Sequence, residues 1–294
     1  MLLTKDSSWM VLCLMRFTDN KNKSNNVIPG LGLTLGITVT MLSLIVLIPL
    51  ASILVYGLSI TPYEFLEIIN EDNVKNSIIT SVGCSLIAAF VNCFFGIIIA
   101  WTLVRYQFPY RRIMDGLIEL PFALPTAVAG ITLSKMYSDT GIPGKWLSRI
   151  GIRVSYTKLG IVTALIFVGI PFVVRTVQPV LENLEPKYEE AANMLGAGKL
   201  TVFFRVIFPE LLPAAITGFG LAFARGVGEY GSVVYISGNS VKEHTQVVSY
   251  VIMQKLNYMD YSSATAIALV MLIISFVVLF VINLIQISWA RRSK

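Results

Sequence analysis

Two opposite charges lie close together inside an apolar stretch of the sequence. Arg225 and Glu229 are four residues apart, in a run of small residues that includes Gly226 and Gly228. On a helix this spacing places both charges on nearly the same face, where they can neutralise one another and lower the cost of burial. A guanidinium in such a place can also donate a fork of hydrogen bonds to a tetrahedral oxyanion, with the carboxylate tuning its exposure. Both hypotheses are open at this point: a self-neutralising pair, and the lining of a solute path.

A second candidate site lies in the segment of residues 185–210, which is long for a connector. Pro186 suits the first turn of a short helix, and the acids that follow suit its positive end. A glycine at the far end would let the chain turn out of that helix. Small side chains would let another protein approach this helix closely; they are Ala191, Ala192 and Gly196. An ordinary helix at the membrane surface is the alternative interpretation.

Several kinds of catalytic site are excluded by the residues present. ATP hydrolysis needs a phosphate-binding loop of the form G-x-x-x-x-G-K-[ST], but Gly198-Lys199 is followed by Leu200. The three cysteines have no metal-ligand spacing, and the single histidine, His244, has no second histidine or cysteine nearby. We therefore predict no catalytic residue, no metal site and no cofactor within this chain.

The composition indicates that lipid is the solvent of this chain. Of its 294 residues 55% are hydrophobic and only 14% are charged, whereas soluble domains carry about a quarter charged residues. The net charge of +6 is spread along the edges of apolar stretches and forms no basic stripe. This arrangement is typical of membrane topology and gives no reason to expect a nucleic-acid partner.

Six stretches are long and apolar enough to cross a bilayer as helices. They are Leu31–Tyr56, Ile78–Val104, Gly116–Met136, Leu159–Leu181, Leu211–Ser237 and Ala264–Trp289. Prolines interrupt the third and fourth stretches, and Pro121, Pro125 and Pro171 are candidate hinges or simply kinks. The sequence thus predicts an all-α integral membrane protein, with a polar N-terminal segment 1–26 and a membrane domain 27–294.

Lysine and arginine predict the orientation of these spans. Most of the 23 lysines and arginines fall on one side if both termini are cytoplasmic, and segment 185–210 then lies on that side as well. An exception is the outer loop, residues 138–158, which is basic. Either a loop this short tolerates the charge, or its charge attracts anions or an acidic partner protein. Since six spans are few to enclose a solute path, we expect a second membrane chain.

The segment 185–210 resembles the EAA loop of ABC-importer permeases. The family pattern is E-A-A, three residues, G, nine residues and I-x-L-P. The chain keeps its main positions at the right spacing, as Glu190, Ala191, Ala192, Gly196 and Pro209. Val206 and Phe208 depart from the pattern but stay apolar. The resemblance implies the type I permease fold, with a cytoplasmic coupling helix that docks on an ATPase and carries its motion to the spans.

Three further segments are similar to the sulfate and molybdate permease group. They are ELPFALPTAVAG at 119–130, IPFVVRTVQP at 170–179 and FARGVGEYG at 223–231. The opening GLGLTLGIT at 30–38 resembles the T-type subunit family of sulfate/thiosulfate permeases. The similarity extends over residues 27–290.

The family implies a set of partners and a location. They are two ATPase subunits that bind the ATP, a second and homologous permease chain of the W type, an extracytoplasmic sulfate-binding protein and the bilayer itself. The location would be a bacterial inner membrane or a plastid inner envelope, with both termini on the ATP side.

Two alternatives stay open on the sequence alone. A molybdate or tungstate permease would share the loop and most of the motifs. An ion-coupled secondary carrier would show internal repeats and several charges within its spans, whereas Arg225 and Glu229 are the only clear mid-span charges.

Overall fold

The computed structural model describes residues 31–185 and 187–292, and all regular elements in these ranges are helices. Five of them are long and apolar enough to cross a membrane, and a bent pair supplies a sixth span if it is counted as one. The five are Gly32–Ser59, Asp72–Arg105, Lys158–Asn183, Lys199–Val227 and Tyr261–Ser288. The predicted all-α membrane fold is confirmed. The polar segment 1–26 and Pro186 lie outside the described residues.

The first span consists of three consecutive helical pieces. They are α2 (Leu31–Leu42), the π-helical turn η1 (Ser43–Leu47) and α3 (Ile48–Ser59). Contacts divide the chain between Ser52 and Ile53, so the part up to Ser52 is described by itself. Within it the Thr38 and Thr40 hydroxyls donate to main-chain carbonyls one turn back, which satisfies them without a second helix.

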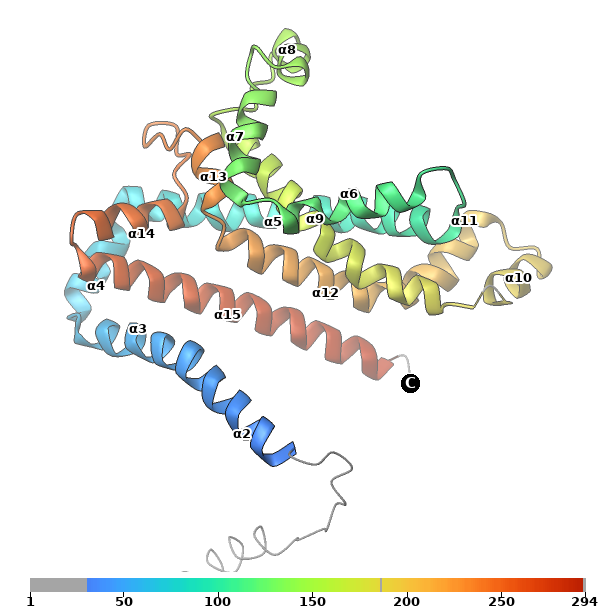
Figure 1. The fold of residues 1–294 in the computed structure, drawn as a ribbon, viewed down its shortest axis with the longest axis horizontal. Helices are drawn as coiled ribbons and strands as arrows, with labels where there is room; N and C mark the ends of the chain where they lie inside the picture. The colour runs from blue at the N-terminus through green and yellow to red at the C-terminus, as the bar shows by residue number, and fades with distance from the viewer. Residues whose placement is uncertain (1–30, 186, 293–294) are drawn as a thin grey trace, which may run out of the picture. The chain divides into compact units, whose positions relative to one another are not determined.

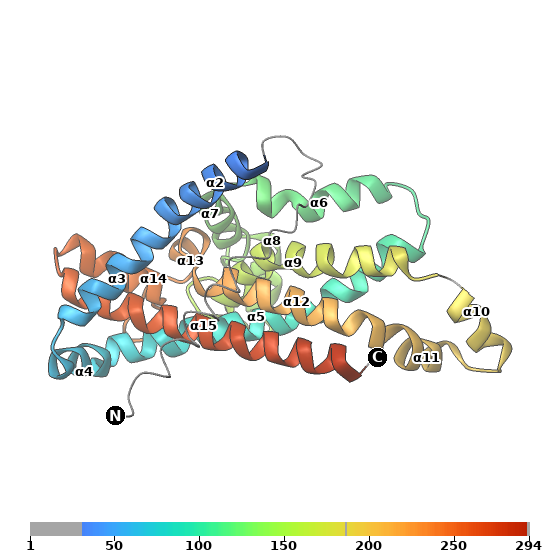
Figure 2. The ribbon, with the colours of Figure 1, turned by 90° about the horizontal axis from the view of Figure 1, so that it is seen from below.

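Four long helices lie side by side in the remaining part (Figures 1 and 2). They are α5 (Asp72–Arg105), α9 (Lys158–Asn183), α12 (Phe208–Val227) and α15 (Tyr261–Arg292). Small residues let α9 approach its neighbours, since a Cβ at Gly96 of α5 would come within 2.6 Å of Val173 Cγ1. Likewise a Cβ at Gly218 of α12 would come within 2.8 Å of Val173 Cα. Such close packing is how helices associate in lipid, where the hydrophobic effect does not drive them together.

The third predicted span, Gly116–Met136, is not one helix. It is broken into α6 (Arg111–Ala123) and α7 (Thr126–Met136), which meet at an angle of 111°. Leu124 is extended, with ψ 136°, because the ring of Pro125 disfavours the helical conformation for the residue before it. The sequence located the interruption, and the two halves count as the predicted third span if they are taken together.

The fifth predicted span, Leu211–Ser237, is also interrupted. After α11 (Lys199–Val202) and η2 (Phe203–Ile207), α12 runs only to Val227, and the short helix α13 (Gly231–Ile236) follows a turn. Gly130 of α7 lies against the backbone of Ser232 in α13, so the two broken spans pack together. The glycines near Glu229 did not reveal this break, because glycines occur both in packed span helices and at helix ends.

Shorter helices connect the spans, and most were not predicted because they are too short to span lipid. They are α4 (Pro62–Asn70), α8 (Ile142–Arg149), α10 (Lys187–Met194) and α14 (Val248–Asn257); of these only α10 was expected. Lys255 at the end of α14 pairs with Glu71 at 3.1 Å and with Asp260 at 3.7 Å. Burial raises the pKa of Asp260, but hydrogen bonds from Ser263 and the charge of Lys255 outweigh it and hold that pKa below its usual value.

We predict that Gly130→Ala destabilises the protein. The added Cβ would come within 2.7 Å of Ser232 Cα, so α7 and α13 would have to separate, at a cost of about 1–3 kcal/mol. Thermal unfolding of the purified protein in detergent, followed by tryptophan fluorescence, measures the effect.

The matched control is Gly116→Ala in α6, where no atom lies within 4 Å of the added Cβ. This change should leave stability unchanged or raise it by about 0.5–1 kcal/mol, because alanine favours helix. Equal melting temperatures for the two variants would contradict the close packing of α7 on α13.

Candidate coupling loop and translocation path

The EAA-like residues form a compact helical turn after α9. Glu190, Ala191 and Ala192 lie on α10, and Gly196 reverses the chain with φ +82°, a left-handed conformation that favours glycine. The N–H of Ala197 donates to the Ala192 carbonyl at 3.1 Å, as expected at a helix end that a left-handed residue closes. The predicted helix and the predicted turn are both present.

This segment lies at the end of the helix group where α15 also ends (Figure 2). Ala192 and Ala197 pack inward against the core, while Glu190 is exposed. Pro209 lies in the first turn of α12, so the segment leads directly into the fifth span.

The tip of the segment presents apolar side chains that contact little of their own chain. Met194 is 90% exposed, Leu195 89% and Leu200 76%. These residues lie outside the helices that could span a membrane or at the very start of one. Exposed apolar clusters at such places mark surfaces that bind another protein.

An ion pair that the sequence did not reveal fastens α10 to the second span. Arg105 at the end of α5 pairs with Glu189 of α10 at 2.7 Å and donates to the Leu184 carbonyl at 3.2 Å. Both charged side chains are mostly buried, with 19% and 24% exposure. One turn earlier on α5, Trp101 packs edge to face against Phe203, with 5.5 Å between the ring centroids. The two partners are far apart in the sequence, so only tertiary structure brings them together.

Arg225 and Glu229 form the predicted ion pair, with 2.5 Å between Nη1 and Oε2. The geometry differs from the prediction, because Glu229 lies beyond the end of α12 in the turn before α13. Its other carboxylate oxygen accepts hydrogen bonds from the backbone N–H of Ser232 at 2.9 Å and from its hydroxyl at 3.0 Å. Its carbonyl accepts from the Ser249 hydroxyl at 2.8 Å. Glu229 therefore joins α12, α13 and α14.

The two members of this pair differ in exposure. The Glu229 side chain is 1% exposed and that of Arg225 is 37%, so the carboxylate is a fixed anchor and the guanidinium keeps one open side. Gly226 lies against Ser85 of α5, whereas Gly228 faces open space. An anion could approach Arg225 from its open side, and this contact stays a prediction.

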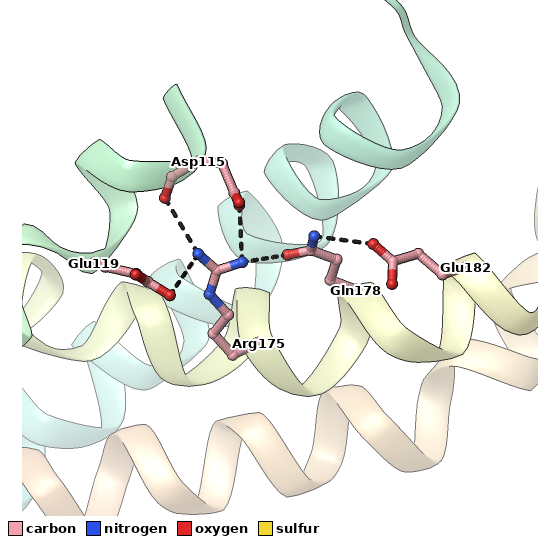
Figure 3. Close-up of polar contacts among 5 residues, drawn as sticks. All are labelled: Asp115, Glu119, Arg175, Gln178 and Glu182. Carbon is pink, nitrogen blue, oxygen red and sulfur yellow. Dashed lines mark hydrogen bonds and ion pairs between the residues drawn. The ribbon is translucent and has the colours of Figure 1, made fainter. Parts of the chain in front are cut away.

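A third charged cluster lies between α6 and α9 and was missed by the sequence analysis. Arg175 of α9 contacts Asp115 and Glu119 of α6, and Gln178 of its own helix (Figure 3). Arg175 lies within the fourth span, so the charges within the predicted spans are not limited to Arg225 and Glu229. The signal available in the sequence was the spacing of the two acids, one turn apart on a helix that is mostly apolar after its first two residues.

The prolines considered as hinges occupy different settings. Pro125 stands at the 111° bend between α6 and α7. Pro121 lies inside α6, and Pro171 lies inside α9, which continues unbroken past it.

In the described parts of the chain, no three histidine, cysteine or acidic side chains come together to hold a metal ion.

We predict that Glu229→Ala destabilises the protein more than Glu229→Gln does. Alanine removes the acceptor for both Ser232 hydrogen bonds and leaves Arg225 unpaired, at a cost of about 3 kcal/mol. Glutamine keeps an oxygen for Ser232 but turns its NH2 group towards Arg225, so it loses only the ion pair, for about 1–2 kcal/mol.

Thermal unfolding in detergent distinguishes the variants, with Glu210→Gln on the exposed side of α12 as control. A wild-type melting temperature for Glu229→Ala would show that Glu229 anchors nothing.

Comparison with known proteins identifies the family. The family model described as binding-protein-dependent transport system inner membrane component matches residues 92–293. The sulfate transport system permease protein CysT of Escherichia coli (strain K12) is 44% identical over 269 residues, which are 92% of this chain and 97% of that protein. The probable sulfate transport system permease protein cysT of Nephroselmis olivacea is 47% identical over 242 residues, or 82% of this chain and 85% of that protein.

A solved structure agrees on the fold. A chain in the crystal structure of a bacterial alginate ABC transporter, in complex with an alginate pentasaccharide-bound periplasmic protein, superposes with a TM-score of 0.72. It is 17% identical, and the match covers 86% of this chain and 92% of that chain. At this identity the likeness shows the permease fold alone. Together with the family match, it confirms the predicted fold and the resemblance: this chain belongs to the family of binding-protein-dependent transport system inner membrane components, and within it to the CysT sulfate transport permeases.

Proposed function

We propose that this chain is the permease subunit of an ATP-driven importer of sulfate and thiosulfate, and that it forms half of the path across the membrane. The single observation that carries the substrate is the 44% identity to the sulfate permease of Escherichia coli along 97% of its length. Sulfate is doubly charged and strongly hydrated, so an apolar layer excludes it unless a polar path replaces its water.

The partners follow from the proposed role. Two ATPase subunits bind the ATP and dock on the exposed tip formed by Met194, Leu195 and Leu200. A second, homologous permease chain of the W type completes the path, and an extracytoplasmic sulfate-binding protein delivers the anion on the opposite face. The tip and the C-terminal end of α15 then face the ATP side, in a bacterial inner membrane or a plastid inner envelope. The excess of lysine and arginine on that side supports this orientation.

The contacts around the tip supply a route for motion. The exposed residues Glu190, Ala191 and Gly196 extend the surface that meets the ATPase, while Ala192 fixes the inner face of the segment. The Arg105–Glu189 pair carries a displacement of α10 to α5, and Pro209 carries it to α12. Bending at Pro121, Pro125 or Pro171 would then let the spans alternate between outward and inward access.

Arg225 is the proposed anion contact at the break in the fifth span. Its guanidinium has an open side, and the buried Glu229 fixes its position. A fork of N–H donors suits the tetrahedral oxyanions, and molybdate or tungstate would fit the same chemistry. Competition between these anions in an uptake assay therefore distinguishes the sulfate permease from the molybdate or tungstate alternative.

We predict that the chain, co-expressed with its partner subunits, restores radiolabelled sulfate uptake in a strain that lacks its own permease. Excess thiosulfate should compete, and molybdate should compete poorly. Arg225→Gln should abolish uptake while the complex still assembles, because the anion loses its donor fork.

The matched control is Arg112→Gln, which removes an exposed arginine outside both the path and the coupling segment. Wild-type uptake by Arg225→Gln would refute the anion contact, and strong competition by molybdate would favour the molybdate alternative. Uptake that continues without the ATPase subunits would point to a secondary carrier.

We predict that Leu195→Ser weakens docking of the ATPase. Leu195 is 89% exposed, so the change costs the isolated permease little stability but removes apolar area from the interface. Loss of one such side chain should weaken the complex by about 1–2 kcal/mol, roughly tenfold in affinity.

Co-purification of the ATPase with the permease measures the change. Ile142→Ser, which alters an 80%-exposed aliphatic side chain on α8, serves as control because it is predicted to lie on the opposite face. Equal ATPase recovery from both variants would contradict docking at the tip.

A further inference from the structure

The helix α6 is held on α9 by one arginine and by a small apolar contact that includes Ile118 and Phe122. The Arg175 guanidinium donates to the Asp115 carboxylate at 2.8 Å and to the Asp115 carbonyl at 3.2 Å, and it pairs with Glu119 at 2.8 Å (Figure 3). Phe122 of α6 also meets Phe172 of α9 edge to face, with 5.1 Å between ring centroids. Of the residues in α6 only Ile118 and Pro121 are buried. The contact is therefore largely polar, unlike the close apolar packing of α5, α9 and α12.

The charge balance excludes a second anion site at Arg175. One guanidinium faces the carboxylates of Asp115 and Glu119, and Gln178 links it to a third carboxylate, Glu182, at 3.1 Å. This excess of negative charge would repel a dianion. The cluster is better suited to hold two helices together than to accept the transported solute.

The arrangement also allows the contact to open. Gln178 lies on α9 itself and accepts from Arg175 at 2.7 Å, so the guanidinium keeps a partner when α6 leaves. Asp115 and Glu119 are 40% and 58% exposed, so the chain itself does not enclose either carboxylate. Release of α6 therefore uncovers only two buried residues of that helix, Ile118 and Pro121.

Motion of α6 would reach the fifth span through consecutive contacts. The bend at Pro125 joins α6 to α7, and α7 packs against α13 at Gly130 and Ser232. The start of α13 is held by Glu229, the partner of Arg225. The Arg175 contact and the Arg225–Glu229 pair thus lie at the two ends of one continuous chain of packed elements.

We propose that Arg175 is a positioning residue that locks α6 onto α9 in the state described here, and that this lock must open in each transport cycle. The inference rests on the proposed function, since it assigns a step of transport to a residue that does not touch the anion. In the resting complex the Arg175 contact opposes the release of α6 from α9. Loss of this contact should therefore allow ATP hydrolysis in the absence of the loaded binding protein.

The first test measures ATP hydrolysis by the complete reconstituted complex, with and without the loaded sulfate-binding protein. Arg175→Gln and the double variant Asp115→Asn/Glu119→Gln should raise hydrolysis without binding protein by about fivefold or more, while sulfate transported per ATP falls. Arg175→Lys, which keeps the charge but loses the fork, should be intermediate. Arg112→Gln on the exposed side of α6 should behave as wild type. If all lock variants keep wild-type hydrolysis, or lose hydrolysis and assembly together, Arg175 has only a structural role.

The second test fixes α6 to α9 directly. Phe122→Cys and Phe172→Cys are combined after the three native cysteines are replaced by alanine, and the complex is treated with a bifunctional methanethiosulfonate reagent that spans the space left by the two rings. Uptake should fall by about tenfold or more and return on reduction, because the cross-link prevents release of α6. Each single-cysteine variant, treated identically, controls for modification of one thiol alone. Full uptake by the cross-linked complex would overturn the proposal, whereas absence of sulfate uptake by the uncross-linked wild type would instead refute the proposed function.

Discussion

A charge inside a membrane is tolerated only beside a partner that balances it, and this constraint governs the internal organisation of the protein. Two charged clusters within the described spans obey it. Arg225 pairs with the almost fully buried Glu229, and Arg175 pairs with acids of α6; Arg105 and Glu189 pair in the same way where α5 ends. Because the cost of an isolated charge in lipid is several kcal/mol, each pair also fixes the helices that carry it. The ion pairs thus stabilise contacts between helices in lipid, where no hydrophobic effect favours helix association.

The same constraint explains why the two breaks in the spans meet. Helix ends expose main-chain N–H and C=O groups, which lipid cannot satisfy. The break before α7 and the break before α13 are packed against each other at Gly130 and Ser232, and the Glu229 carboxylate accepts the N–H of Ser232. Irregular backbone at membrane depth is found where protein or a solute path surrounds it. The meeting of these two breaks, beside Arg225, is the reason to place the path there.

The coupling segment shows the opposite distribution of contacts. Its inner face is fixed by Ala192, Ala197 and the Arg105–Glu189 pair, while its tip is apolar and exposed. A rigid base with an exposed apolar tip suits a part that must transmit an applied displacement without deforming. The proposed path of motion uses a polar contact at each end. The mostly buried Arg105–Glu189 pair holds α10 on α5, whereas the more exposed contact of Arg175 with α6 is the one proposed to open.

The sequence by itself determined the fold class, the positions of most spans and the short helix at Lys187–Met194, because each depends on local composition and spacing. The EAA pattern was readable for the same reason, since a helix followed by a left-handed glycine is a local structure. The interruption at Pro125 was visible, but its 111° bend was not, because the direction of a broken helix depends on what it packs against. The end of α12 at Val227 was not readable, because the glycines there suit a packed span helix as well as a helix end. Only the tertiary structure paired Arg175 with Asp115 and Glu119, and Arg105 with Glu189, because such pairs are decided by which distant helices lie side by side. The charges that the sequence could pair were those one helical turn apart, Arg225 and Glu229, and even there the structure decided that Glu229 anchors three helices and leaves Arg225 its open side.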